Sequence, residues 1–279
     1  MAIELGKFNN LEIVKEVDFG LYLDGGDEGL ILLPSRYVPY ECEIGQKIDV
    51  FLYLDNEERL VATTLKPYVE VGQFAALEVA WVNKFGAFLD WGLMKDLFCP
   101  FREQVRKMEV GHKYVVHAHV DEESFRIVAS AKVEHYLSKE MPTYEFEDEV
   151  DVLIWQKTNL GYKVIIDNQF QGLVFENQVF RPLEIGDRMK GYISQVREDG
   201  KIDVALQRTG RQQTLDFADV LLKYMERNGG RCYLHDKSPA EEIYDRFKVS
   251  KKVFKKAVGD LYKRRLIEIT DHGLLLKEE

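Results

Sequence analysis

Short runs of alternating hydrophobic and polar residues fill the first three quarters of the chain. Residues 60–66, 127–133 and 202–208 are examples of this alternation, residues 11–14, 87–90 and 113–119 are further short β runs, and turns that contain glycine, aspartate or asparagine separate the runs. Alternation with a period of two is typical of strands that bury one face, and there is little sustained helical periodicity in this part of the chain. The pattern therefore predicts a structure made mainly of β-strands.

Three repeats make up this β-rich part. Residues 4–24 align without gaps on residues 70–90, and nine of the 21 positions are identical. Each repeat also contains a glycine that is followed by a second glycine 25 residues later. The three pairs are Gly20 and Gly45, Gly86 and Gly111, and Gly161 and Gly186. The first glycines of the pairs are 66 and 75 residues apart, a longer period than solenoid repeats have, which indicates duplicated domains.

Each repeat has the size of a small closed β-barrel. About five strands fit into one unit, and closing such a sheet into a barrel of the OB type removes the unpaired edges that an open sheet would leave. Phe19 and Phe85 are each followed directly by a glycine. We expect this glycine to allow a bulge where the second strand bends to close the barrel.

A helical pattern begins near residue 214. Apolar residues recur at three- to four-residue spacing in residues 214–228, which end at two glycines. These apolar residues are Phe217, Val220, Leu221 and Tyr224. Residues 238–241, SPAE, match a capping box with proline at the first helical position, which predicts a second helix ending at Phe247.

The last part of the chain completes a winged helix-turn-helix pattern. Residues 251–265 are predicted to form an amphipathic helix with a basic exposed side. Its apolar face consists of Val253, Phe254, Ala257, Val258 and Leu261. Residues 267–276, with a turn at 271–273, are predicted to form a β-hairpin. Helix, short turn, basic helix and hairpin are the elements of a winged helix-turn-helix domain.

These patterns define the predicted fold class. It is a mainly β multidomain protein with three tandem five-stranded OB-type barrels, followed by an α+β winged helix-turn-helix domain. The predicted domains are residues 1–66, 67–140, 141–213 and 214–279.

Charge is distributed unevenly over these four domains. The chain has a formal net charge of −10, and the domains carry −7, −2, −3 and +2 in chain order. Residues 246–265 hold nine basic residues and a single acidic one, Asp260. Focused positive charge attracts a phosphate backbone, whereas the acidic first domain repels it. We therefore expect nucleic acid at the C-terminal helix and a protein partner for the first barrel.

Motifs inside the repeats resemble those of the S1 domain, an OB-fold RNA-binding domain. The second repeat carries FGAFLD at residues 85–90, then KDLFCPF and EVGHK; the first carries DFGLYLD, EGLILLP and CEIGQK, and the third NLGYKVI, QGLVFEN and EIGDRMKG. In that family, aromatics next to the glycine stack on RNA bases. The resemblance implies this role for Phe85 and Phe88, Phe19 and Tyr22, and Tyr162 with Phe175. The third repeat departs from the motif at Leu160, and the family's histidine is replaced by Leu32, Cys99 and Phe175.

The chemistry of these residues fits RNA independently of the resemblance. An exposed ring beside a lysine offers a base a π face and its phosphate a counter-charge, and Lys84 and Lys163 are placed to supply it. Trp81 is included in the predicted site. In the alternative interpretation these rings are barrel core, but two aromatics that flank one glycine do not easily both point inward. The predicted phosphate ligands of the basic helix are Lys251, Lys252, Lys255, Lys256, Arg264 and Arg265.

The whole chain resembles one family more specifically. Three S1-like barrels followed by DKSPAEEIYDRFKVSKKVFKKAVGDLYKRRLIEI are similar to the conserved virulence factor B family, also known as the YitL-like family. The resemblance covers residues 1–279. It implies a bacterial RNA-binding regulator that acts after transcription and has no known catalytic activity.

Other classes of function find little support in the sequence. No P-loop, GxGxxG, nucleophile elbow or HExxH motif occurs. His117 and His119 share one strand face but have no acidic or cysteine partner at metal-binding spacing, so we expect satisfied strand histidines. Three cysteines without a CxxC motif argue against disulfides and structural zinc. We therefore expect no catalytic residues, no metal and no cofactor.

Two hypotheses remain after these exclusions. The first is a protein that binds single-stranded RNA through the second and third barrels and the basic helix. The alternative is a protein-interaction adaptor or a duplex-DNA-binding regulator in which the winged helix dominates. Since no apolar run approaches a membrane span and no signal-peptide pattern is present, we expect a cytoplasmic monomer without membrane contact.

Overall fold

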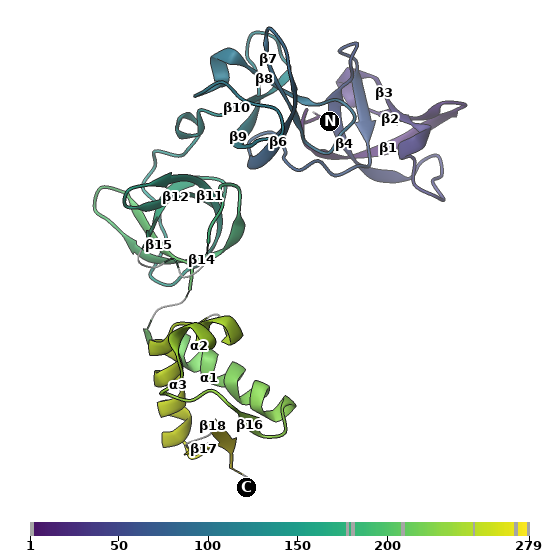
Figure 1. Cartoon of the computed structure of the whole chain (residues 1–279). Helices are drawn as coiled ribbons and strands as arrows, with labels where there is room; N and C mark the ends of the chain where they lie inside the picture. Colours follow the sequence, from purple (N-terminus) through teal and green to yellow (C-terminus); the bar gives the residue numbers. More distant parts are fainter. Residues whose placement is uncertain are drawn as a thin grey trace.

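The computed structural model describes residues 3–176, 179, 182–207, 210–247, 249–270 and 273–277, and the side chains of 210–216 are outside this description. Three closed β-barrels follow one another along the chain, and a small helical domain lies at the end of the molecule opposite the N-terminus (Figure 1). The predicted fold class is confirmed.

The three barrels share one topology. In each, the strands follow the order first, second, third, fifth, fourth around the barrel, and the third and fifth strands pair in parallel. The first barrel consists of β1 (Phe8–Val17), β2 (Gly20–Asp24), β3 (Leu30–Pro34), β4 (Lys47–Leu54) and β5 (Leu60–Thr63). The second consists of β6 (Phe74–Val82), β7 (Gly86–Asp90), β8 (Leu97–Pro100), β9 (Lys113–Val120) and β10 (Ile127–Ser130). The third consists of β11 (Glu149–Thr158), β12 (Gly161–Ile166), β13 (Phe170–Phe175), β14 (Arg188–Val196) and β15 (Ile202–Ala205).

Four short 3₁₀ helices are described in the loops of the first two barrels and in the segment after the second. They are η1 (Gly26–Glu28), η2 (Ser35–Tyr37), η3 (Phe101–Glu103) and η4 (Val133–His135).

The glycine at the start of each second strand has a different role from the one predicted. The bulge lies on the first strand of each barrel, between Ile13 and Lys15, Val79 and Trp81, and Ile154 and Gln156. The glycine instead permits close approach of the third strand. A Cβ atom on Gly86 would overlap the backbone carbonyl oxygen of Cys99, and Gly20 and Gly161 face the corresponding carbonyls.

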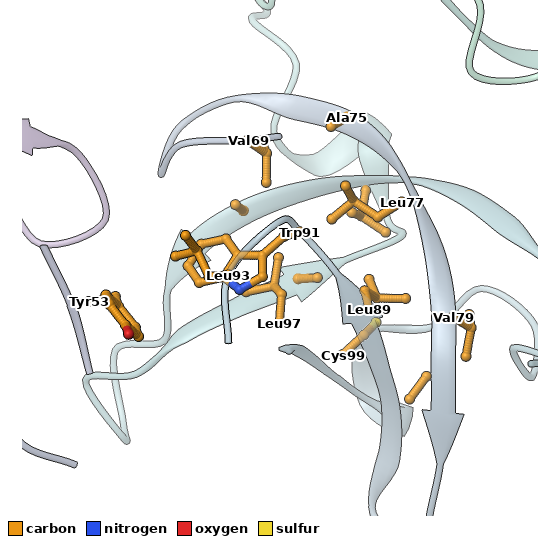
Figure 2. Packing of buried hydrophobic residues seen from close by; sticks show 14 of the residues in the cluster. Tyr53, Val69, Ala75, Leu77, Val79, Leu89, Trp91, Leu93, Leu97 and Cys99 are labelled. Carbon is orange, nitrogen blue, oxygen red and sulfur yellow. The ribbon is translucent and has the colours of Figure 1, made fainter. Parts of the chain in front are cut away.

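The first and second barrels share a hydrophobic core. Phe51 and Tyr53 of β4 belong to the same buried cluster as Trp91 and Leu93 of the second barrel (Figure 2). The Phe51 and Trp91 rings meet edge to face with centroids 5.7 Å apart. Burial of these aromatic surfaces fixes the two barrels against one another.

The second and third barrels are joined by a further cluster. Buried side chains from both barrels and from the segment between them form it: Phe74, Val115, Val133, Leu137, Leu153 and Ile165. The backbone of Phe74 is held on both sides, because its N–H donates to Asn168 Oδ1 at 3.1 Å and its carbonyl accepts from Arg188. These hydrogen bonds to the backbone fix the orientation of the two barrels, in addition to the apolar contact.

A histidine pair lies next to this second junction. His117 is 7% exposed and stacks on Tyr136 with ring centroids 4.1 Å apart, while His119 Nε2 shares a hydrogen bond with the Tyr136 hydroxyl. Burial, and then the neighbouring His119, lower the pKa of His117 to about 4. The expectation of satisfied histidines is only partly right, since among the described atoms neither Nδ1 has a hydrogen-bond partner.

The C-terminal domain is a winged helix. Its elements are α1 (Gly210–Arg227), β16 (Arg231–Cys232), α2 (Ala240–Phe247), α3 (Lys251–Lys263), β17 (Ile267–Thr270) and β18 (Gly273–Leu276), and the strand order is β16-β18-β17. The five predicted apolar residues of α3 are all buried. Helix α1 begins at Gly210, four residues earlier than predicted, and Val220 is 54% exposed and therefore not part of the core. Residues 271 and 272 of the predicted turn lie outside the described residues, and the four domain boundaries remain predictions.

Neither a membrane-spanning helix nor a cluster of metal ligands occurs among the described residues. None of their helices has the length and hydrophobicity needed to cross a bilayer. Nor does any group of three or more His, Cys, Asp and Glu side chains in the described part form an arrangement that could hold a metal ion.

Replacement of Gly86 by alanine should destabilise the second barrel. The added methyl group meets backbone rather than a mobile side chain, and overpacking of this kind costs about 1–3 kcal/mol. Gly259→Ala is a control with the opposite sign, because a Cβ there has no neighbour within 4 Å and alanine stabilises a helix interior by about 0.5–1 kcal/mol. Urea unfolding measures both changes, by tryptophan fluorescence and by circular dichroism. Equal stability of Gly86→Ala and the parent would refute the close-approach explanation.

The low pKa of His117 predicts a loss of stability in acid. The unfolded chain takes up a proton near pH 6.5 and the folded protein only near pH 4, so the free energy of unfolding falls as the pH drops through this range. The loss reaches about 3 kcal/mol by pH 4. His117→Phe keeps a ring for Tyr136 to stack on and should show a smaller decrease between pH 7.5 and 4.5 in urea unfolding. Identical pH dependence of the two proteins would show that His117 does not contribute.

Candidate nucleic-acid interface

Three aromatic side chains form a row on the outer face of the second barrel. Strand pairing places Trp81 opposite Phe88 and Phe88 opposite Phe98, so the row crosses β6, β7 and β8. The Trp81 and Phe88 rings are parallel within 3° and their centroids are 3.7 Å apart, and Phe98 follows at 4.9 Å. Trp81 is 45% exposed. The exposed part of the indole gives a base an aromatic surface on which to stack.

A turn next to the row fixes the position of Phe85. The side-chain oxygen of Asn83 accepts hydrogen bonds from the backbone N–H groups of Phe85 at 2.8 Å and Gly86 at 3.2 Å. Such an Asx turn sets the direction of the chain at the hairpin. The Phe85 ring is 61% exposed, and the ammonium group of Lys84 lies 5.0 Å from its centroid. The predicted pairing of an exposed ring with a lysine is confirmed at this position.

The aromatic row lies in a groove with a volume of about 960 Å³. Trp81, Phe85, Phe88 and Phe98 line it from the second barrel. The first barrel adds Tyr53, Leu54, Asn56 and Glu58. The groove thus belongs to both barrels, and most of a nucleobase and its sugar could be enclosed in a space of this size.

Polar groups surround the rings in the groove. Trp81 Nε1 donates to a carboxylate oxygen of Asp96 at 2.7 Å, which holds the indole in the stacked orientation. Arg102 forms an ion pair with Glu123 at 3.1 Å and with Asp121. Hydrogen bonding by Ser124, then by Arg102, lowers the pKa of Asp121, so this carboxylate stays ionised.

The other two barrels have no aromatic row at the equivalent outer positions. In the first barrel, Lys15 pairs with Tyr22 and Tyr22 with Leu32. In the third barrel, the same three positions are Gln156, Lys163 and Leu173. Because the backbone pairing is the same, the difference between the barrels lies in the side chains alone.

The structure corrects the interpretation of Tyr162. This side chain is 8% exposed and belongs to the core of the third barrel. It follows Gly161 directly, whereas Phe88 and Tyr22 lie two positions after their glycines, and successive strand residues point to opposite faces. A shift of one residue therefore places the Tyr162 ring inside the barrel. Lys163 occupies the outer position instead and pairs with Glu134 at 2.7 Å.

A second register error concerns the position of the family's histidine. Cys99 points into the barrel, is fully buried, and has its pKa raised to about 12 by burial. Pairing with the second strand shows that Leu32, Phe98 and Leu173 are the equivalent outer residues. Phe98 was missing from the sequence-predicted site, although FCP at residues 98–100 offered an aromatic on an alternating strand.

The remaining predicted rings are spread over the first and third barrels. Phe19 is 56% exposed and meets Tyr22 edge to face, with centroids 6.3 Å apart. Phe175 is half-buried and lies 6.0 Å from the guanidinium of Arg197. Leu160 is 66% exposed at the position that corresponds to Phe19 and Phe85. The third barrel therefore lacks the exposed ring that its neighbours carry beside the glycine.

The basic helix α3 is exposed as predicted. Lys252, Lys255, Lys256, Arg264 and Arg265 are exposed, and Lys251 is half-buried. Arg264 forms an ion pair with Asp260 at 3.4 Å. Tyr262, which was not predicted as a site residue, is 53% exposed among these cations. This side of α3 combines positive charge with one ring, a combination that suits a phosphate backbone and a base.

Comparison with known families identifies two domains. Residues 5–65 match the S1 domain, and residues 219–276 match the CvfB-like winged helix domain. Both domain types occur widely in nucleic-acid-binding proteins.

Similar proteins of comparable length occur in bacteria. The uncharacterized protein YitL of Bacillus subtilis is 30% identical, over 92% of this chain and 89% of YitL. Conserved virulence factor B of Staphylococcus aureus is 21% identical, over 86% of this chain and 82% of the length of that protein. A crystal structure of a multidomain protein with nucleic acid binding domains from Streptococcus pneumoniae aligns over 98% of both chains, with 23% identity and a TM-score of 0.43.

Proposed function

The chain belongs to the conserved virulence factor B family, which includes YitL, and from this premise we propose that it binds single-stranded RNA. In this proposal, RNA bases stack on the second barrel and helix α3 contacts phosphates. The protein acts after transcription as a regulator and not as an enzyme. The regulatory part of the proposal rests on the relationship to conserved virulence factor B, whose name links that protein to virulence.

The aromatic row of the second barrel is the observation that carries the proposal. Trp81, Phe88 and Phe98 are stacked in sequence on the barrel surface. Buried aromatic clusters are ordinary, but this row lies in an open groove, where Trp81 is 45% exposed and the neighbouring Phe85 is 61% exposed. Single-stranded bases expose their own π faces, and stacking them on such rings contributes about 1–3 kcal/mol per base. Bases in a duplex are stacked on one another and have no free face to offer.

Cations outside the groove would supply phosphate contacts. Lys84 lies beside Phe85 at the edge of the row, and α3 carries the chain's highest density of cations. Such contacts are independent of base sequence and make affinity depend on salt. The molecule as a whole is acidic and would repel the backbone, so phosphate contacts depend on local cations such as these.

Cysteine chemistry supports the proposed cellular setting. Cys42, Cys99 and Cys232 are free thiols, and the last two are buried. Free cysteines are typical of a reducing compartment, which supports a role in the cytoplasm, where messenger RNA is found.

Duplex DNA is the second candidate ligand. The observation that favours it is the winged helix itself, in which the helix equivalent to α3 commonly enters the major groove. Its exposed lysines would serve a duplex as well as a single strand. In this alternative the barrels act as spacers or protein adaptors, and the aromatic row would have no part in binding.

Truncation of two rings tests the stacking model. Phe85→Ala combined with Phe88→Ala should weaken binding of a fluorescently labelled single-stranded RNA by about 5- to 150-fold for each base that loses its partner, measured by fluorescence anisotropy. Phe125→Ala is the matched control, because Phe125 is 72% exposed on the same barrel but lies outside the groove. Unchanged affinity of the double variant would refute stacking on the second barrel.

Removal of charge from α3 tests the role of this helix in binding phosphate. Lys255→Ala with Lys256→Ala should reduce the slope of log affinity against log salt by about 0.7 for each phosphate that is no longer neutralised. Lys223→Ala with Arg227→Ala removes the same charge from exposed positions on α1 and should leave the slope unchanged. A DNA duplex measured in parallel decides between the two ligands. Tighter binding of the duplex, with weakening only in the α3 variant, would favour the winged-helix alternative.

A further inference from the structure

The first barrel forms one wall of the groove, and this wall is firmly attached to the second barrel. The ammonium group of Lys95, on the second barrel, donates to the backbone carbonyls of Leu54 at 3.0 Å and Asp55 at 2.7 Å. Burial lowers the pKa of Lys95, as expected for a cation enclosed by backbone. Tyr53 belongs to the same buried cluster as Trp91 and Leu93 (Figure 2). The turn that follows β4 is therefore a fixed part of the groove.

This wall places a carboxylate against a cation of the second barrel. Glu58, in the turn between β4 and β5, forms an ion pair with Arg126, which precedes β10. Both residues line the groove, and their side chains are 54% and 51% exposed. The other groove arginine, Arg102, pairs within its own barrel. Of the two groove arginines, Arg126 is thus the one whose counter-charge is supplied by a different domain.

The charges that line the groove determine how this ion pair affects phosphate binding. Four carboxylates and three cations line it: Glu58, Asp96, Asp121 and Glu123, with Lys95, Arg102 and Arg126. A phosphate that approaches the aromatic row finds no surplus of positive charge there. To bind inside the groove it has to displace a carboxylate from an arginine, and a guanidinium accepts phosphate in the same forked geometry as carboxylate.

Arg126 is the better placed of the two arginines for this exchange. Arg102 is held by two carboxylates, one of which has a lowered pKa. Within the described part of the chain, Arg126 pairs with a single carboxylate, and both members of that pair are half exposed to solvent. Exposed ion pairs of this kind are weak and are exchanged readily for another anion.

We propose that Arg126 is a phosphate ligand of the RNA groove, and that Glu58 of the first barrel competes with the RNA for it. The inference rests on the proposed function, because it assigns a further role to the same groove. The acidic first barrel then takes part in RNA binding as a competing anion. It weakens the binding of a strand that places a phosphate at Arg126, whereas a strand that does not use Arg126 meets only the general repulsion of the acidic barrel.

Neutralising Glu58 should strengthen RNA binding. Glu58→Gln keeps the size of the side chain and removes the competing charge. We expect about two- to fivefold tighter binding of the labelled single-stranded RNA by fluorescence anisotropy, which corresponds to the range measured for exposed ion pairs. Glu57→Gln is the matched control. It makes the same charge change at the adjacent position, where the side chain is 71% exposed and pairs with Arg59 at 3.0 Å.

A double-mutant cycle that combines Arg126→Ala with Glu58→Gln tests the role of Arg126. Arg126→Ala should weaken RNA binding and reduce the salt slope by about 0.7, the value for one neutralised phosphate. In the Arg126→Ala background, Glu58→Gln should have no larger effect than Glu57→Gln. Urea unfolding of each variant separates loss of binding from loss of folding.

The outcomes separate this inference from the proposed function. If Glu58→Gln and Glu57→Gln change affinity equally, the effect is general charge repulsion and the competition is refuted, while stacking on the aromatic row still stands. If Glu58→Gln still strengthens binding without Arg126, another cation is the ligand and the assignment is wrong. If the parent protein does not bind the RNA at all, both proposals are overturned together.

Discussion

The rest of the structure depends on how closely the second and third strands of each barrel approach one another at the shared glycine. At Gly20, Gly86 and Gly161 a Cβ atom would overlap a backbone carbonyl of the neighbouring strand, so a side chain is excluded there. The close approach fixes the pairing register, and the register decides which residues face outward, because successive strand residues alternate between the two faces. In the second barrel this register brings Phe88 opposite Phe98.

The outer surfaces of the barrels differ although the backbone pairing is the same in all three. The outer row that reads Trp81, Phe88 and Phe98 in the second barrel is replaced by other side chains in its neighbours. The replacement in the third barrel includes Lys163, which is engaged by Glu134 of the segment after the second barrel. One copy of the repeat therefore presents stacked rings, while another uses the same position to hold the junction together. Duplicated domains can diverge in this way because outer residues contribute little to the core.

The fold could be predicted from sequence far better than the site. Alternation and glycine spacing are repeated three times, so each copy supports the interpretation of the others, and helix α3 has an unbroken apolar face. The site depends on register, and motif matching does not detect a shift of one residue: similarity assigns Tyr162 to the site and matches Cys99 to the family's histidine, but both side chains lie inside. The ion pair of Glu58 with Arg126 spans 68 positions between two domains, and no local pattern indicates it.

The junction between the first two barrels holds the acidic first barrel against the groove. A flexible spacer of charge −7 would move away from an approaching nucleic acid, and its repulsion would be screened over about 8 Å at physiological salt. Here Phe51 and Tyr53 are buried with Trp91, so the acidic barrel cannot withdraw from the groove. Its carboxylates act at ion-pair distance, where screening is weak. A ligand therefore has to gain enough from stacking on the rings to offset this fixed negative charge, which favours unpaired bases over a bare phosphate backbone.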